Sequence, residues 1–135
     1  MLFEAARDLV RQAHPGPAVI VAQAAVEVGV ETAIAFGLTA RDVLEPLHDW
    51  IDTTVNSWSP TNERVQGLWR AVTGDKLSDV SSWVDYAAGV KARHAFAHQA
   101  RTVTQEQAER FIAAAERVIA HVLNMIESLP EIETA

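Results

Sequence analysis

Apolar and polar residues recur with a helical period along most of the chain. Between residues 104 and 128 the apolar side chains stand at three- and four-residue steps, the spacing of one face of an α-helix. They are Phe111, Ile112, Ala115, Val118, Ile119, Val122 and Met125. No segment shows the two-residue alternation of a strand. The pattern therefore predicts an all-α protein.

Proline, glycine and capping residues divide this pattern into five or six predicted helices. We expect helices over residues 2–13, 17–36, 39–55 and 59–74, one from residue 77 to a turn near 99–103, and one over 104–128. Gly37 is predicted to cap the second helix, and Thr39 to open the third. Thr104 and Gln107 form the pattern of a capping box. Short connections predict a single-domain helical bundle over residues 1–135.

The second helix is predicted to be the centre of the bundle. Gln23, Glu27 and Glu31 stand four residues apart and form one polar stripe, whereas nearly all the rest of the helix is Ala, Val or Ile. A helix so apolar must be covered on several sides, by other helices or by a second copy of the chain. The stripe is most simply a solvated face, although a carboxylate within it could reach the arginine and histidines of residues 90–98 and join a site there. Its charges also make this segment a poor membrane span.

Composition narrows the functions that the chain could have. The net charge of -7 excludes attraction to nucleic acid through global charge, so RNA binding would need a local basic patch. The absence of cysteine excludes disulfides and thiolate metal sites. The first residues do not resemble a signal peptide. We therefore expect a cytoplasmic protein that does not associate with membranes.

Residues 90–98 are the exception in this acidic chain, because they contain Lys91, Arg93, His94 and His98 but no carboxylate. An arginine holds a phosphate with a planar fork of donors, and a histidine transfers protons near neutral pH. Lys91, Arg93 and Arg101 are therefore the candidate RNA-binding residues. Arg93, His94 and His98 are the candidate catalytic residues.

Two other interpretations of this segment remain. Cationic side chains are favourable at a helix C-terminus, so the segment could be a solvated helix end. His94 and His98 are four residues apart and could share a metal. No nearby carboxylate or cysteine offers a third ligand, however, and no glutamate follows His94 as in a zinc-protease helix. We therefore predict no metal and no cofactor.

The spacing of Arg93 and His98 resembles the signature of the HEPN superfamily, in which a histidine follows an arginine after four to six residues. Two further pairs, Arg7 with His14 and Arg41 with His48, have a spacing that matches. A polar residue follows the arginine directly in all three pairs (Asp8, Asp42 and His94), so this feature does not separate them. The context favours Arg93, because small or apolar residues, a turn and a capped helix come next. His14 instead adjoins a Pro-Gly-Pro break, and Arg41 is predicted to lie in the first turn of a helix.

The resemblance implies a HEPN-like bundle and a metal-independent endoribonuclease of the toxin or defence type. Arg93 would hold the phosphate and His98 would act as base or acid, with His94 as a possible helper. A homodimer would place two motifs in one cleft, and a cognate antitoxin protein would control the enzyme. The alternatives are a non-catalytic HEPN-like module that binds nucleotide, RNA or protein as a dimer, and a purely structural helical dimer.

Four tryptophans and His121 lie outside this segment. Helical spacing predicts that the tryptophans are core or interface anchors, and Trp58, in a predicted loop, should be the most exposed of them. The sequence suggests no partner for His121.

Overall fold

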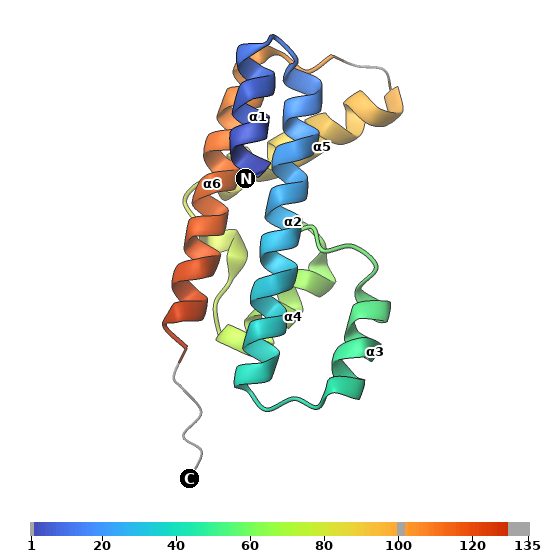
Figure 1. The fold of residues 1–135 in the computed structure, drawn as a ribbon, viewed down its shortest axis with the longest axis vertical. Coiled ribbons are helices and arrows are strands. Elements are labelled where there is room, and N and C mark those ends of the chain that lie inside the picture. The colour runs from blue at the N-terminus through green and yellow to red at the C-terminus, as the bar shows by residue number, and fades with distance from the viewer. Residues whose placement is uncertain (1, 100–101, 130–135) are drawn as a thin grey trace.

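The computed structural model describes residues 2–99 and 102–129, except for the side chains of residues 2 and 96–99. In this part of the chain there are helices and no strands, which confirms the all-α prediction (Figure 1). The helices are α1 (Leu2–Arg11), α2 (Pro15–Ala40), α3 (Glu45–Val55), α4 (Glu63–Thr73), the 3₁₀ turn η1 (Leu77–Asp79), α5 (Trp83–Gln99) and α6 (Gln105–Glu127).

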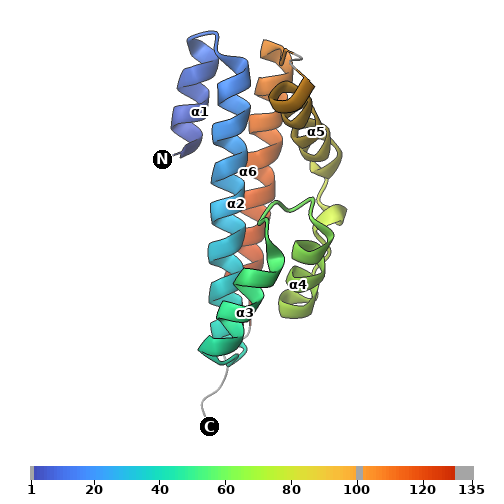
Figure 2. The same cartoon turned by 90° about the vertical axis from the view of Figure 1, so that its right-hand side faces the viewer.

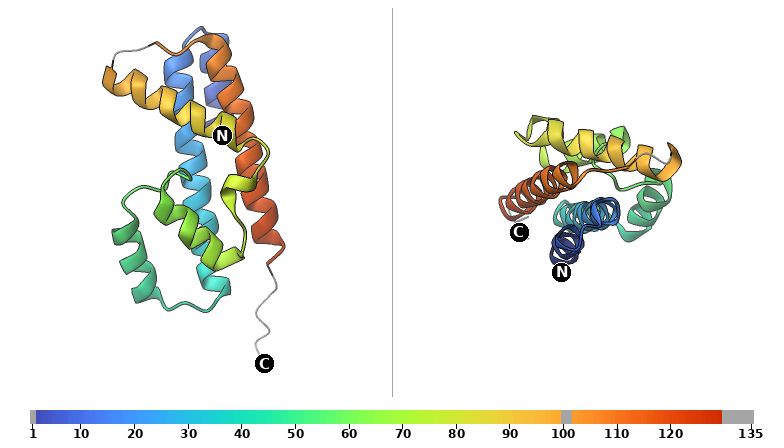
Figure 3. Two further views of the ribbon diagram at one scale, coloured as in Figure 1. Left: turned by 180° about the vertical axis from the view of Figure 1, so that it is seen from behind. Right: turned by 90° about the horizontal axis from the view of Figure 1, so that it is seen from above.

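The two longest helices, α2 and α6, form the centre of the fold. They lie side by side and run in the same direction, with α1 antiparallel to them (Figures 1 and 2). α5 packs across one end of the pair and α4 against the other end of α2, as the view from behind shows (Figure 3). The core is built mainly from apolar side chains of α2 and α6, among them Val26, Val30, Phe111, Val118 and Val122.

Helix α2 is the central helix that its apolar composition predicts. By length and composition alone it could cross a membrane, the one helix in the described chain of which this is true. It packs against α1, α4, α5 and α6, and these contacts bury eleven of its residues. The apolar composition of α2 is thus accounted for in part by its burial against four other helices.

The predicted boundary between the second and third helices is wrong. α2 continues through Gly37 to Ala40, and Thr39 lies within it rather than opening the next helix. Gly37 is buried, and a Cβ atom there would overlap Cγ1 of Val72 on α4. The glycine therefore allows close packing of α4 instead of ending α2. α3 begins only at Glu45.

The start of α6 follows the sequence pattern closely. The Thr104 hydroxyl accepts a hydrogen bond from the Gln107 amide (3.1 Å), and the Gln107 side chain accepts one from the Thr104 amide (2.9 Å). The predicted capping box is thus confirmed. Two other starts come later than predicted: α4 begins at Glu63 with Asn62 as its cap, and α5 begins at Trp83 after η1.

Candidate functional site

The basic segment occupies the last turns of α5. This end of the helix extends away from the α2–α6 pair (Figure 1). Lys91 and His94 are exposed there, whereas Arg93 is half-buried. His98 also lies on α5, but its side chain falls outside the described part of the structure, and Arg101 is not among the described residues.

Arg93 belongs to an inward-facing polar stripe on α5. Ser82, just before the helix, Tyr86 and Arg93 follow each other at steps of four and seven residues and so share one side of it. Ser82 and Tyr86 are buried, and Oγ of Ser82, the hydroxyl of Tyr86 and Nε of Arg93 have no hydrogen-bond partner among the described residues. Buried polar groups in proteins are nearly always paired, because an unpaired one costs about 1–3 kcal/mol. Three polar atoms without hydrogen-bond partners along one side of α5 are therefore an unusual feature of this fold.

Helix α2 contributes further polar groups to this region. Gln23 is only 6% exposed; its amide nitrogen donates to a carboxylate oxygen of Glu27 (3.2 Å), and its own oxygen has no partner in the described structure. Burial raises the pKa of the Tyr86 hydroxyl above its ordinary value, and the negative charge of Glu27 raises it further. Gln23 and Glu27 thus lie on the side of α2 that meets α5.

The expectation of a solvated polar stripe on α2 is therefore wrong for Gln23, whereas Glu31 is exposed. The reason is that α5 packs against this side of α2. The negative charge of Glu27 on α2 acts on Tyr86 of this stripe, where it adds to the effect of burial and raises the pKa of the hydroxyl further. Arg93 makes no hydrogen bond or ion pair with Glu27, or with any other residue that the structure describes.

The three arginines that match the family spacing differ in the hydrogen bonds and ion pairs that their guanidinium groups form. Arg7 of α1 forms an ion pair with Glu116 of α6. Arg41 donates from Nε to the carbonyl oxygen of Val72 (3.1 Å) and so ties the end of α2 to α4. These two guanidinium groups connect helices. Arg93 alone of the three has no such partner in the described chain.

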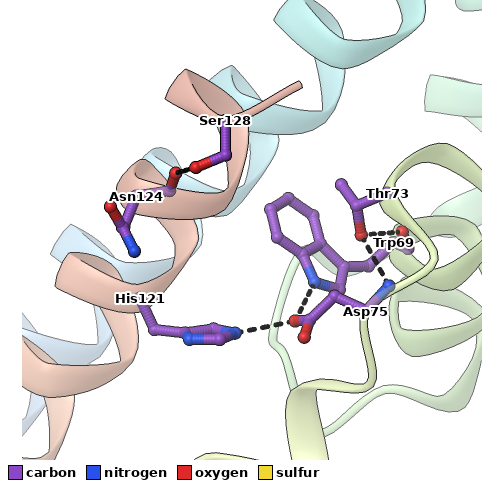
Figure 4. A network of polar contacts seen from close by, with 6 residues as sticks. All are labelled: Trp69, Thr73, Asp75, His121, Asn124 and Ser128. Carbon is purple, nitrogen blue, oxygen red and sulfur yellow. Dashed lines mark hydrogen bonds and ion pairs between the residues drawn. The ribbon is translucent and has the colours of Figure 1, made fainter. Parts of the chain in front are cut away.

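A second polar network, which the sequence did not reveal, centres on Asp75 (Figure 4). Oδ2 of Asp75 accepts a hydrogen bond from Nε1 of Trp69 (2.8 Å) and lies 2.7 Å from Nε2 of His121. The Asp75 amide donates to the Thr73 hydroxyl (3.1 Å), which in turn donates to the Trp69 carbonyl (2.7 Å). The network joins the chain after α4 to α6.

The charge of Asp75 is stabilised by these neighbours. Burial opposes its ionisation, but the hydrogen bonds from Trp69 and His121, the charge of His121 and the Lys76 amide outweigh burial. The pKa of Asp75 is therefore lower than its ordinary value. No signal in the sequence connects Asp75 with His121, since they are 46 residues apart.

An aspartate that orients a histidine is also part of many acid-base sites, where the histidine activates a hydroxyl or thiol. In the described structure no hydroxyl or thiol is hydrogen-bonded to His121. Trp69, the other partner of Asp75, is fully buried. The arrangement is thus that of a structural clamp that holds α4 and η1 against α6.

The tryptophans differ from the expectation in one respect. Trp50 on α3 is the most exposed, at 63%, whereas Trp58 is half-buried and its Nε1 donates to Asp52 (3.3 Å). The prediction that Trp58 is the most exposed is wrong, because the connection after α3 folds back against α2 and α3. No three or more His, Cys, Asp or Glu side chains of the described residues are grouped so as to hold a metal ion.

Comparisons of the chain with protein-family models, with curated proteins and with solved structures give no match. The resemblance to the HEPN superfamily consequently rests on residues 90–98 and on the capped helix that follows them.

Proposed function

We propose that this protein is a metal-independent endoribonuclease of the HEPN type, with its active site at the C-terminal end of α5. One observation carries the proposal: Arg93 is the one arginine with the family spacing whose guanidinium has no protein partner among the described residues. A half-buried, unpaired guanidinium is suited to hold a phosphate with two parallel hydrogen bonds. The exposed Lys91, two residues before Arg93 on α5, adds positive charge to this end of the helix.

The reaction follows from these groups and from the chemistry of RNA. One histidine removes the proton of the 2′-hydroxyl, and the 2′-oxygen attacks the adjacent phosphorus. The bond from phosphorus to the 5′-oxygen breaks, and the leaving oxygen takes a proton from an acid. The products are a 2′,3′-cyclic phosphate and a 5′-hydroxyl. Arg93 stabilises the charge that develops on the phosphate oxygens.

His98 is assigned the role of base or acid, with His94 as its helper. Because efficient cleavage uses both an acid and a base, we assign the active form to a homodimer in which Arg93 and His98 of both chains line one groove. Arg101 would extend the basic surface for RNA. A toxin or defence enzyme of this kind would act in the cytoplasm under the control of an antitoxin protein.

The test is cleavage of a single-stranded RNA in the presence of EDTA by the purified protein, by His98→Ala and by His14→Ala. His14 is an exposed histidine of the chain that precedes α2, so its variant is the matched control. We expect the parent and His14→Ala to produce 2′,3′-cyclic phosphate ends, and His98→Ala to be slower by about 100-fold or more.

Other outcomes would replace this proposal. Equal cleavage by all three proteins would remove His98 from the mechanism. If the parent protein binds RNA without cleaving it, and His98→Asn binds equally well, the chain is a non-catalytic RNA-binding module.

A further inference from the structure

We propose that α2 and the neighbouring α3 form the surface through which two copies of this chain associate. The proposal adds to the dimer of the proposed function the surface that holds it together. Its test depends on neither Arg93 nor His98.

The first observation is that the solvent-exposed side of α2 is apolar. Val28 is 55% exposed and Phe36 is 61% exposed. Only Glu31 and Thr32 are polar among the exposed residues of this helix between positions 17 and 36, which are Pro17, Ile20, Ala24, Val28, Glu31, Thr32, Ala35 and Phe36. A long helix that is apolar on its buried side and also on its exposed side has a second surface to cover.

The second observation is that α3 continues this apolar surface. Leu44 before the helix, and Leu47 and Trp50 within it, are exposed large hydrophobic residues. α3 projects from the body of the molecule on one side of α2 (Figure 1). Its apolar face is therefore only partly covered within one chain.

The connection after α3 joins the two parts into one face. Ala24, Glu27, Val28 and Glu31 of α2 line a shallow groove together with Asn56, Ser57 and Trp58 of this connection, so two carboxylates border the apolar residues there. The Trp58 ring in turn donates to Asp52 of α3. Figure 2 views the molecule from this side, with α2 along its middle and α3 beside one end of α2.

The size of the face matches a second protein chain. Aromatic side chains bury about 150–250 Å² each when they are covered, and aliphatic ones somewhat less. The exposed parts of the six large residues of the face therefore amount to roughly 600–700 Å², close to the about 800 Å² that each partner contributes to a standard interface. These six are Ile20, Val28, Phe36, Leu44, Leu47 and Trp50. Patches on monomeric proteins are usually smaller, at most about 300–600 Å².

Two further arguments favour a second copy over a membrane surface. Glu45, Asp49 and Asp52 of α3 are exposed beside the apolar residues, and their negative charges would be repelled by an anionic lipid surface. The end of α5 extends on the same side of α2 as α3 does (Figure 1). A second chain on this face would therefore lie next to the basic segment of the first, as the proposed composite active site requires.

The test is the oligomeric state of the protein, measured by sedimentation velocity over a range of concentrations. Val28→Glu and Trp50→Glu each place a charge in the centre of one half of the face. Leu123→Glu is the control, because Leu123 is an exposed leucine of α6 outside this face. We expect the parent and Leu123→Glu to be dimers at micromolar concentration, and both face variants to dissociate about 100-fold more easily.

Circular dichroism of each variant shows whether it is folded, and Leu47→Glu, at another exposed position, replaces any variant that is not. A parent protein that stays monomeric would overturn the proposal, as would a dimer that neither face variant weakens. A parent monomer that sediments with vesicles of neutral phospholipid would assign the face to a membrane instead. Because none of these measurements uses RNA, failure of the proposed nuclease leaves their outcome unchanged.

Discussion

At the residue scale, the most informative side chains are of two kinds. Some form hydrogen bonds that the sequence does not predict, and others are buried but have a polar atom without a hydrogen-bond partner. Asp75 stands between the indole of Trp69 and the imidazole of His121 and satisfies both. Ser82, Tyr86 and Gln23 are buried but each keep a polar atom without a partner in the described structure. The first set stabilises the fold, whereas the second weakens it.

Replacement of Asp75 by alanine is expected to lower the free energy of unfolding by about 1–3 kcal/mol at pH 7. The buried N–H of Trp69 then loses its acceptor, and its desolvation is no longer compensated. Urea denaturation of the two proteins measures the difference. Asp79→Ala, at an exposed position in η1, is the control and should change stability by no more than about 0.5 kcal/mol.

The effect should also depend on pH in a defined direction. The pKa of Asp75 is lower in the folded protein than its ordinary value, so the ionised carboxylate stabilises the fold above the unfolded pKa of about 4. This contribution is lost as the pH falls through the lower, folded pKa. The stability difference between the parent and Asp75→Ala should consequently shrink below about pH 4. A difference that grows in acid would contradict the role given to the carboxylate.

At the element scale, close helix packing depends on small residues at the contact points. α5 meets α6 at Gly89, where a Cβ atom would overlap the ring of Phe111. That ring is buried and stacks on Tyr86 with ring centres 5.2 Å apart, so it has little room to move. The position of α5, and with it the basic segment, depends on this contact.

Gly89→Ala is therefore expected to destabilise the protein by about 1–3 kcal/mol, as is usual when atoms are added to a packed interface. Gly67→Ala is the matched control, because Gly67 lies within α4 and nothing approaches its Cβ position within 4 Å. Alanine should stabilise that helix by about 0.5–1 kcal/mol. Thermal unfolding followed by circular dichroism measures both changes. Similar effects of the two substitutions would rule out the tight α5–α6 contact.

At the scale of the whole molecule, charge is distributed unevenly. The chain carries a net charge of -7, yet residues 90–98 have two basic residues, two histidines and no carboxylate. This end of α5 is therefore the part of the chain where we expect RNA to bind, because the net charge of the whole chain opposes non-specific binding. Because the rest of the chain is acidic, few phosphates of a bound RNA would contact basic residues. The affinity for RNA should therefore depend only weakly on salt concentration.

Lys91→Gln is expected to weaken the binding of single-stranded RNA and to reduce the slope of log affinity against log salt by about 0.7, the value for one lost phosphate contact. Lys76→Gln provides the control, because Lys76 is exposed between α4 and η1. Fluorescence anisotropy at several salt concentrations gives both slopes. Equal slopes for Lys91→Gln and the parent protein would place the RNA elsewhere.

The helices, the capping box at Thr104 and the basic segment follow from local features of the sequence, because hydrophobic period, caps and neighbouring charges involve residues close together in the chain. Those features also mark α2 as the central helix. They do not predict what each face of α2 contacts. The same stripe of Gln23, Glu27 and Glu31 is compatible with solvent or with another helix, and only the packing of α5 decides that Gln23 is buried.

Contacts between distant parts of the chain account for the remaining differences. Gly37 has the residue type of a helix cap, but the approach of Val72 from α4 gives it a packing role within α2. The pairing of Asp75 with His121, and the contrast between the paired Arg7 and Arg41 and the unpaired Arg93, likewise depend on neighbours supplied by other helices. A polar residue carries the same chemistry wherever it stands, but its partners are set by the fold, because side-chain hydrogen bonds and ion pairs act only over a few ångströms.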